Sequence, residues 1–182
     1  MNKWTKKRSV MRRYDLTAQM YDSRYSEEQQ AKYKAALDGL SVERAIVLDM
    51  GCGTGLFFDQ IAAKAISVTG VDVSRRLLHL AKKRGKTYSD VHLVQADVDN
   101  LPFQPEVFTH VFAFTVLQNM PNASETLKQC KMTAKKDACF VVSGLKGAIP
   151  LETLGKHLKA AGLQAVSIRD DDALRCCVVT CI

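Results

Sequence analysis

The sequence predicts an α/β protein with a doubly wound, mostly parallel sheet of seven strands that ends in an antiparallel hairpin. Three observations support this fold class. Short apolar stretches alternate with helical segments, a glycine-rich loop follows the first buried strand, and the last two strands have no helix between them. In this interpretation residues 14–182 form a single domain, and residues 14–40 form a helical cover.

The composition is that of an ordinary soluble, globular chain. The 182 residues are 47% apolar and 25% charged. No apolar run approaches the roughly 20 residues that a membrane span needs, so we expect no membrane partner. The six cysteines form no C-x-x-C pair and the N-terminus has no secretory signal. We therefore expect a cytoplasmic protein with reduced thiols and no metal site.

The N-terminus is the most basic part of the chain. Residues 1–13 carry six lysines and arginines and no acid, and the whole chain has a net charge of +7. We expect this segment to be a disordered arm. Such an arm can follow the phosphates of a nucleic acid, or it can be a solubilising tail, and both alternatives stay open here.

The expected cover contains two Tyr-Asp pairs, which begin at Tyr14 and Tyr21. A helix is expected over residues 27–40, with Ser26 as its N-cap. Tyr21 and Tyr25 either anchor this helix on the core or face a ligand. The residues alone do not choose between these two roles.

The stretch 45–55, AIVLDMGCGTG, is the strongest signal in the chain. Its first four residues are apolar, as expected for a strand buried on both faces, and Asp49 follows them. Glycines then stand at alternate positions before a helix expected over 56–65, and glycine lets the backbone approach a ligand that a Cβ would keep away. The loop residues are Gly51, Cys52, Gly53, Thr54 and Gly55.

The glycine spacing separates two classes of ligand. A dinucleotide fingerprint, G-x-G-x-x-G, has its third glycine three residues after the second. Leu56 stands at that position here, so the pattern is G-x-G-x-G instead. This spacing argues against a dinucleotide.

A second acidic residue ends the next expected strand, residues 65–72. Asp72 lies 21 residues after Gly51, where a carboxylate can accept hydrogen bonds from both hydroxyls of a ribose. It could instead cap the helix expected over 75–84, but Ser74 is the better cap candidate. Val73 would then lie beside the base attached to that ribose.

A third strand, expected over 91–97, runs into the turn DVDNLPF, which begins at Asp97. The LDMGCGTG loop, Asp72 and this turn together resemble the class I methyltransferases, which have a seven-stranded, Rossmann-like fold and depend on S-adenosylmethionine. The resemblance is to the methyltransferase type 11 (UbiE-like) group. It covers residues 14–182, although its specific part is limited to the three cofactor motifs.

The resemblance implies S-adenosylmethionine as cofactor and assigns parts of it to particular residues. Asp97 is expected to accept a hydrogen bond from the adenine amino group, and the backbone N–H of Val98 to donate to a ring nitrogen. The Tyr-Asp cover is expected to close over the methionine end. The cofactor-binding residues implied are Tyr21, Asp49, Gly51, Cys52, Gly53, Gly55, Asp72, Val73, Asp97, Val98 and Phe114.

The fourth expected strand, residues 108–117, departs from the family at Thr109, where the family usually has Asp. Its end should face the cofactor, because ligands of open α/β sheets bind outside the carboxyl ends of strands. Gln118 and Asn119 are therefore candidates for substrate contact, together with Tyr25. Asp15, Asp22 and His110 are conceivable bases, but no catalytic residue is assigned.

The remaining segments complete the fold. Helices are expected over 124–134 and 151–161, and strands over 138–143, 165–169 and 176–182.

The resemblance implies methyl transfer, and the acceptor is then the open question. Almost nothing is inserted between the core elements, so we expect no large substrate domain. We expect a small-molecule acceptor, because the Tyr-Asp cover resembles that of enzymes that act on small molecules and a basic tail is weak evidence for RNA. An RNA (tRNA or rRNA) or protein acceptor, with an activating partner subunit, is the alternative. A subunit that binds the cofactor without turnover is a third possibility. The sequence has no Asp/Asn-Pro-Pro-Tyr/Phe and no Pro-Cys motif, which argues against adenine-N6, glutamine and cytosine-C5 methylation.

Overall fold

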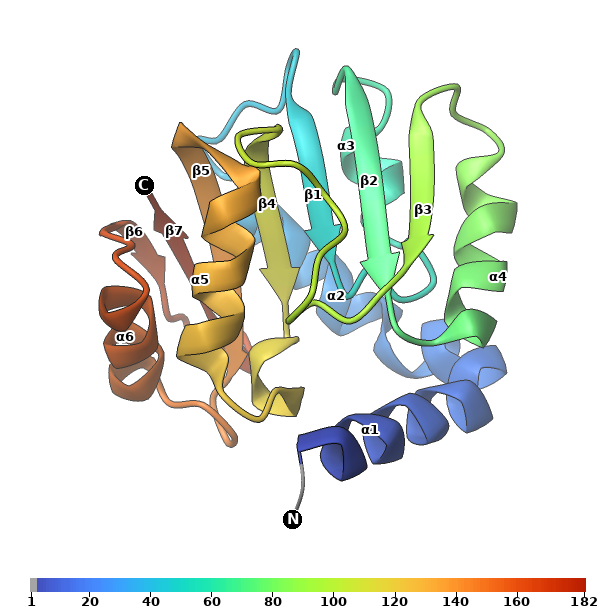
Figure 1. Cartoon of the computed structure of the whole chain (residues 1–182), viewed down its shortest axis with the longest axis horizontal. Coiled ribbons are helices and arrows are strands. Elements are labelled where there is room, and N and C mark those ends of the chain that lie inside the picture. The colour runs from blue at the N-terminus through green and yellow to red at the C-terminus, as the bar shows by residue number, and fades with distance from the viewer. Residues whose placement is uncertain (1–2) are drawn as a thin grey trace.

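The computed structural model describes residues 3–182 and folds them into one mixed sheet between layers of helices (Figure 1). The strands are β1 (Ile46–Met50), β2 (Ser67–Asp72), β3 (Val91–Gln95), β4 (Phe108–Phe114), β5 (Ala134–Leu145), β6 (Ala165–Arg169) and β7 (Cys176–Cys181). The helices are α1 (Lys3–Thr17), α2 (Tyr21–Leu37), α3 (Phe58–Ile61), α4 (Arg75–Gly85), α5 (Ala123–Thr133) and α6 (Leu151–Ala160), with short 3-10 helices η1 (Ala18–Met20) and η2 (Leu117–Asn119).

The strand order of the sheet is β3-β2-β1-β4-β5-β7-β6 in the described chain. The pairs among the first five strands are parallel, whereas β7 is antiparallel to both β5 and β6. This confirms the predicted doubly wound sheet with its final antiparallel hairpin. Because β1 pairs with both β2 and β4, the order reverses there, and ligands of open α/β sheets bind beside that point.

The core lies on both faces of the sheet. Val47 and Leu48 are neighbours on β1 and face opposite sides, yet both are fully buried, as the unbroken apolar run predicts. In Figure 1, α5 and α6 cover the near face, and α2 and α3 lie behind the sheet. Four aromatic rings pack together on the far side, with neighbouring centroids 4.7 to 5.8 Å apart, and they belong to Tyr33, Phe57, Phe112 and Phe114.

The helix after the glycine loop is shorter than expected. The sequence predicts a helix over 56–65, and α3 covers only Phe58–Ile61. The N–H groups of Lys64 and Ala65 both donate to the carbonyl of Ile61. The bond of Lys64 spans three residues, as in a 3-10 helix, and the bond of Ala65 spans four, so α3 ends in a mixed turn that shares one carbonyl.

The largest difference from the sequence-based expectation lies at the N-terminus. The segment expected to be a disordered arm, residues 1–13, is helical from Lys3 onward in α1, and residues 1–2 lie outside the described residues. The second cover helix also begins earlier than expected, at Tyr21, so Ser26 lies inside α2 instead of capping it. Ser74 does cap α4, because its Oγ accepts from the N–H of Leu77 at 3.1 Å.

Hydrogen bonds to residues that are distant in the sequence hold α1 in place. Lys6 Nζ donates to the carbonyl of Met120 at 2.8 Å. Near the other end of the helix, Asp15 accepts from Ser74 Oγ at 2.5 Å and from the N–H of Arg76 at 3.3 Å. The helix therefore lies across the carboxyl ends of the central strands, from η2 to α4 (Figure 1).

All six cysteines are free thiols. Within residues 3–182, no cluster of three or more His, Cys, Asp or Glu side chains is arranged to hold a metal ion. In the same range, no helix combines the length and apolarity of a membrane span.

Candidate functional site

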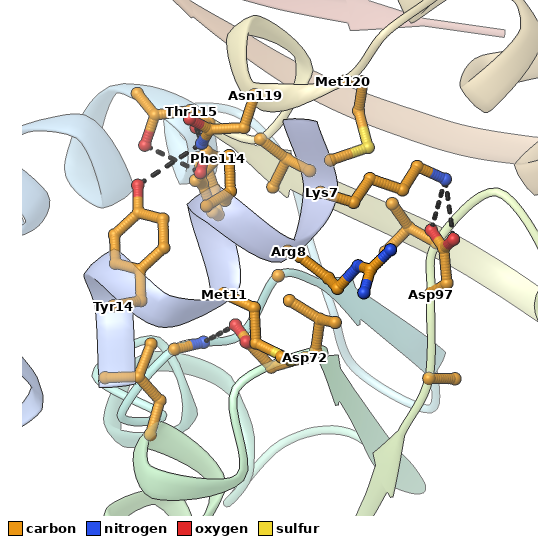
Figure 2. A pocket seen from close by; sticks show the side chains of 18 of the residues that line it. Lys7, Arg8, Met11, Tyr14, Asp72, Asp97, Phe114, Thr115, Asn119 and Met120 are labelled. Atoms are coloured by element: carbon orange, nitrogen blue, oxygen red, sulfur yellow. Dashed lines mark hydrogen bonds and ion pairs between the residues drawn. The ribbon is translucent and has the colours of Figure 1, made fainter. Parts of the chain in front are cut away.

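A cavity lies at the carboxyl ends of the central strands, beneath α1 (Figure 2). The loops after the strands contribute one wall, which contains Gly51, Gly53, Asp72, Val73, Asp97 and Val98. Helix α1 contributes the opposite wall, which contains Trp4, Lys7, Arg8, Val10, Met11 and Tyr14. The three motifs singled out in the sequence thus meet at one cavity.

The glycine loop keeps its backbone open toward this cavity. Gly51 and Gly53 have φ angles of 67° and 57°, in the left-handed region that favours glycine. A Cβ on Gly51 would lie 2.6 Å from Val116 Cγ2, and a Cβ on Gly53 would fill the space beside the Tyr21 ring, 3.7 Å away. Side chains at these two positions would therefore intrude on the cavity or its lining.

Gly55 has a different role from its two neighbours in the motif. A Cβ there would lie 2.4 Å from the Phe58 ring, so this glycine makes room for a core aromatic. The side chain of Cys52 is likewise buried, and a Cβ on Gly70 would lie 2.9 Å from its Sγ. Burial raises the pKa of the Cys52 thiol well above its usual value. Neither Gly55 nor Cys52 is among the residues that line the cavity.

Asp72 is a buried carboxylate held by the backbone. Its Oδ2 accepts from the N–H of Gly53 at 3.0 Å, and its Oδ1 accepts from the N–H of Ser74 at 2.7 Å. Burial raises the pKa of Asp72 to about 6, although these backbone hydrogen bonds act in the opposite direction. The side chain is therefore largely ionised at neutral pH and can accept further hydrogen bonds from a ligand in the cavity.

Asp49 lies deeper than Asp72 and does not line the cavity. Its Oδ2 is buried and has no hydrogen-bond partner among residues 3–182. Burial, reinforced by the nearby charge of Asp72, raises the pKa of Asp49 to about 8. Asp49 is thus largely protonated at neutral pH and lies behind the glycine loop.

Asp97 marks the other end of the cavity and is bound by Lys7 (Figure 2). Lys7 Nζ lies 2.8 Å from Asp97 Oδ1 and 2.6 Å from Oδ2. The same ammonium also contacts Asp99, which in turn accepts a hydrogen bond from Thr126 Oγ1. Burial lowers the pKa of Lys7, but hydrogen bonds and attraction to Asp97 and Asp99 outweigh it, so the pKa lies above its usual value.

Sequence reasoning missed Lys7 entirely. It belongs to the basic segment that was expected to be disordered, and its partners lie 90 and 92 residues away along the chain. The available signal was a run of cations without acids, together with two aspartates in the turn DVDNLPF. Nothing local to either segment indicates that they meet.

The wall after β4 contains Phe114, Thr115 and Asn119 (Figure 2). Thr115 has a φ of 53°, which is strained for a β-branched residue. Its N–H donates to Ser143 Oγ at 2.9 Å, and this bond helps to hold the strained conformation.

Asn119 is fixed at both ends of its side-chain amide by residues of α1. Its Nδ2 donates to the Tyr14 hydroxyl at 3.3 Å, and its Oδ1 accepts from Arg13 Nη2 at 2.9 Å. Gln118, the other candidate for substrate contact, does not line the cavity, and its buried Oε1 has no partner in the described chain. Tyr25 also lies outside the lining, with its ring packed 5.1 Å from that of Tyr21.

The three conceivable bases do not reach the cavity of the described chain. Asp15 is engaged by Ser74 and Arg76, as described above. Asp22 accepts from Arg84 Nη2 at 2.9 Å and from Thr54 Oγ1 at 2.5 Å. His110 lies within β4, where burial lowers its pKa. We therefore assign none of the three to chemistry in this cavity.

Comparison with known proteins gives one family. A family model described as a methyltransferase domain matches residues 48–142. The chain is 33% identical over 98 residues to a demethylmenaquinone methyltransferase of Staphylococcus haemolyticus, covering 52% of this chain and 41% of the relative. It is 28% identical over 148 residues to a malonyl-[acyl-carrier protein] O-methyltransferase of a Marinomonas species, and this match covers 79% of this chain and 54% of the relative. The chain spans about half the length of these curated relatives.

The fold also matches solved structures. Magnesium protoporphyrin IX methyltransferase from Synechocystis PCC 6803, solved with bound S-adenosylhomocysteine, superposes with a TM-score of 0.77. The superposition covers 97% of this chain and 98% of that protein, at 16% sequence identity. At this identity the likeness concerns the fold alone.

Proposed function

Because the chain belongs to the family of methyltransferase domains, we propose that it transfers a methyl group from S-adenosylmethionine to a small-molecule acceptor. The observation that supports this most directly is the pair of carboxylates, Asp72 and Asp97, on the wall of one cavity that also contains the open glycine loop. The ribose and the adenine of the cofactor each require a hydrogen-bond acceptor, and its amino-acid end requires an exposed backbone.

The residues present fit this cofactor. Asp72 is held by two backbone N–H groups and would accept from the ribose hydroxyls. Asp97 would accept from the adenine amino group, with the backbone of Val98 beside it. Gly51 and Gly53 line the cavity, and their lack of a Cβ leaves the loop backbone open to the methionine end.

When bound, the cofactor supplies a methyl group that its sulfonium already activates, so the chain's contribution is mainly alignment and exclusion of water. Phe114, Met11 and Met120 make part of the lining apolar, which keeps water from the reacting atoms. Asn119, with its amide held by Tyr14 and Arg13, is the polar group that we assign to orienting the acceptor.

Two observations favour a small acceptor. One relative named above is a demethylmenaquinone methyltransferase, and its name supports a small-molecule acceptor, whereas the acceptor in the other relative's name is carried on a protein. Three of the six cations in the basic segment that suggested RNA also have partners within the fold. Lys6, Lys7 and Arg13 contact Met120, Asp97 and Asn119 respectively, which leaves fewer cations for phosphates.

The test has two steps. Calorimetric titration with S-adenosylmethionine, S-adenosylhomocysteine and NAD should give binding to the first two and none to NAD. Asp72→Ala and Gly53→Arg should each weaken that binding at least about tenfold, because one removes the ribose acceptor and the other fills the loop space. Near-normal affinity in both variants would refute the site assignment.

The acceptor is tested with methyl-labelled cofactor. Label should transfer to small aromatic and quinol acceptors, and not to tRNA, rRNA or protein fractions. Transfer only to RNA or protein would refute the small-molecule assignment, while cofactor binding without any transfer would favour a subunit that binds the cofactor without turnover.

A further inference from the structure

Lys7 occupies a position in the cavity that the proposed function gives to the cofactor. Its ammonium lies within hydrogen-bonding distance of both oxygens of Asp97, the carboxylate that would otherwise accept from the adenine amino group. Lys7 is only 9% exposed and lines the cavity. Figure 2 shows its side chain running from α1 along the cavity to Asp97.

An ammonium and an adenine amino group are both N–H donors, so they satisfy the same acceptor. The ammonium is charged and therefore makes the stronger hydrogen bonds, while the amino group is neutral. Any donor that takes Asp97 from Lys7 must first break a partly buried ion pair, and this lowers its apparent affinity.

We infer that Lys7 competes with the adenine of the cofactor for Asp97, so that α1 acts as a latch that the cofactor must release. This inference rests on the proposed function, because it assumes that adenine binds at Asp97. It concerns the control of that site by a segment lying before the matched methyltransferase region, residues 48–142.

The structure also provides a place for the released ammonium. Lys7 already contacts Asp99, two residues beyond Asp97, and Asp99 is oriented by Thr126. Lys7 can therefore give up Asp97 and keep Asp99 as a partner, so that its charge is not left unpaired in a partly buried place.

The other contacts of α1 confine the proposed movement to one end of the helix. Asp15 is bonded to Ser74 and Arg76 at the other end of the helix, and these contacts do not involve Asp97. Release of Lys7 thus requires a change at the N-terminal end of α1 and leaves its attachment to α4 in place.

The experiment is calorimetric titration of the full chain with S-adenosylhomocysteine. Lys7→Met removes the ammonium but keeps an unbranched apolar side chain, and Arg12→Met is the matched control, since Arg12 is an exposed cation on the same helix and does not line the cavity. We expect Lys7→Met to bind about fivefold to tenfold more tightly than the wild type, and Arg12→Met to be unchanged. Thermal melting of each ligand-free variant verifies that it is folded.

A double-mutant cycle identifies the partner. In the background of Asp97→Asn, which removes the charge that holds Lys7, the gain from Lys7→Met should largely disappear. Binding by a folded Lys7→Met that is no tighter than that of the wild type would overturn the latch and leave the proposed function standing. An equal gain in affinity from Lys7→Met in the Asp97→Asn background would do the same.

Binding by Lys7→Met alone, with none by the wild type, would support the latch in its strongest form. Absence of binding in both would overturn the proposed cofactor site and the latch with it.

Discussion

Asp72 gives the sharpest prediction, because its ionisation is coupled to the ligand it would bind. Only the carboxylate can accept hydrogen bonds from two ribose hydroxyls, since a protonated carboxyl uses one oxygen as a donor. Burial raises the pKa of Asp72 to about 6. Binding of S-adenosylhomocysteine should therefore weaken as the pH falls through about 6.

The size of the effect follows from the pKa. Above pH 7 the side chain is almost fully ionised, and the affinity should be constant. One unit below the pKa, protonated Asp72 outnumbers the carboxylate by about ten to one, so the apparent dissociation constant should rise about tenfold by pH 5. The cause is the cost of ionising a buried acid, which the backbone N–H groups of Gly53 and Ser74 only partly offset.

The assay is calorimetric titration from pH 5 to 8, with circular dichroism to show that the protein stays folded. Asp72→Asn is the matched control. It cannot ionise, so its affinity should be lower at neutral pH and nearly independent of pH in this range. A flat profile for the wild type, or the same slope in Asp72→Asn, would refute the role given to Asp72.

Three further predictions concern the loop, the buried acid and the acceptor wall. Asp49 has a pKa of about 8 in the folded protein, well above its ordinary value, so its contribution to the free energy of unfolding is complete below about pH 4 and is lost as the pH rises through 8. In urea unfolding, Asp49→Asn should therefore remove a fall in that free energy of up to about 1.4 kcal/mol per pH unit. Gly51→Ala should abolish ligand binding, because its Cβ would lie 2.6 Å from Val116, whereas Gly147→Ala has open space and should bind normally in the same titration. Asn119→Ala should slow methyl transfer about tenfold or more in a labelled-methyl assay while changing cofactor affinity less than threefold, because it removes a group assigned to the acceptor; a loss of cofactor affinity as large as the loss of rate would contradict that assignment.

The fold could be predicted from the sequence because its main signals are local. The apolar run of β1 indicates a strand that is buried on both faces, and the alternating glycines indicate a loop with left-handed backbone angles. The missing helix between β6 and β7 indicates their antiparallel pairing. Each of these patterns lies within a few residues of the structure it specifies.

The site could be predicted only in part, because membership of a motif does not decide which residues face the cavity. Gly53 and Asp72 line the cavity, whereas Cys52 and Gly55 pack against the core. Asn119 lines the cavity but its neighbour Gln118 does not. The roles of all these residues in binding a cofactor or an acceptor remain predictions.

Helix α1 could not be predicted because its order depends on distant partners. Its sequence has little of the regular apolar spacing that marks a helix at the surface of a core. The charges that suggested disorder meet partners about a hundred residues away, as Lys6 does at Met120 and Lys7 at Asp97. Local composition carries no information about such pairings.

The position of α1 also has a practical consequence for handling the protein. Trp4 lines the cavity, so a purification tag joined ahead of α1 would lie close to the cavity and would act on the helix that covers it. The other terminus is attached elsewhere, since the backbone of Ile182 pairs with that of Gln164 at the far edge of the sheet. Figure 1 shows the start of α1 and the end of β7 on opposite sides of the molecule. Ligand affinities measured on a chain tagged at its C-terminus would therefore be free of any effect of the tag on α1. A different affinity in an N-terminally tagged preparation would show how strongly α1 resists displacement from the cavity.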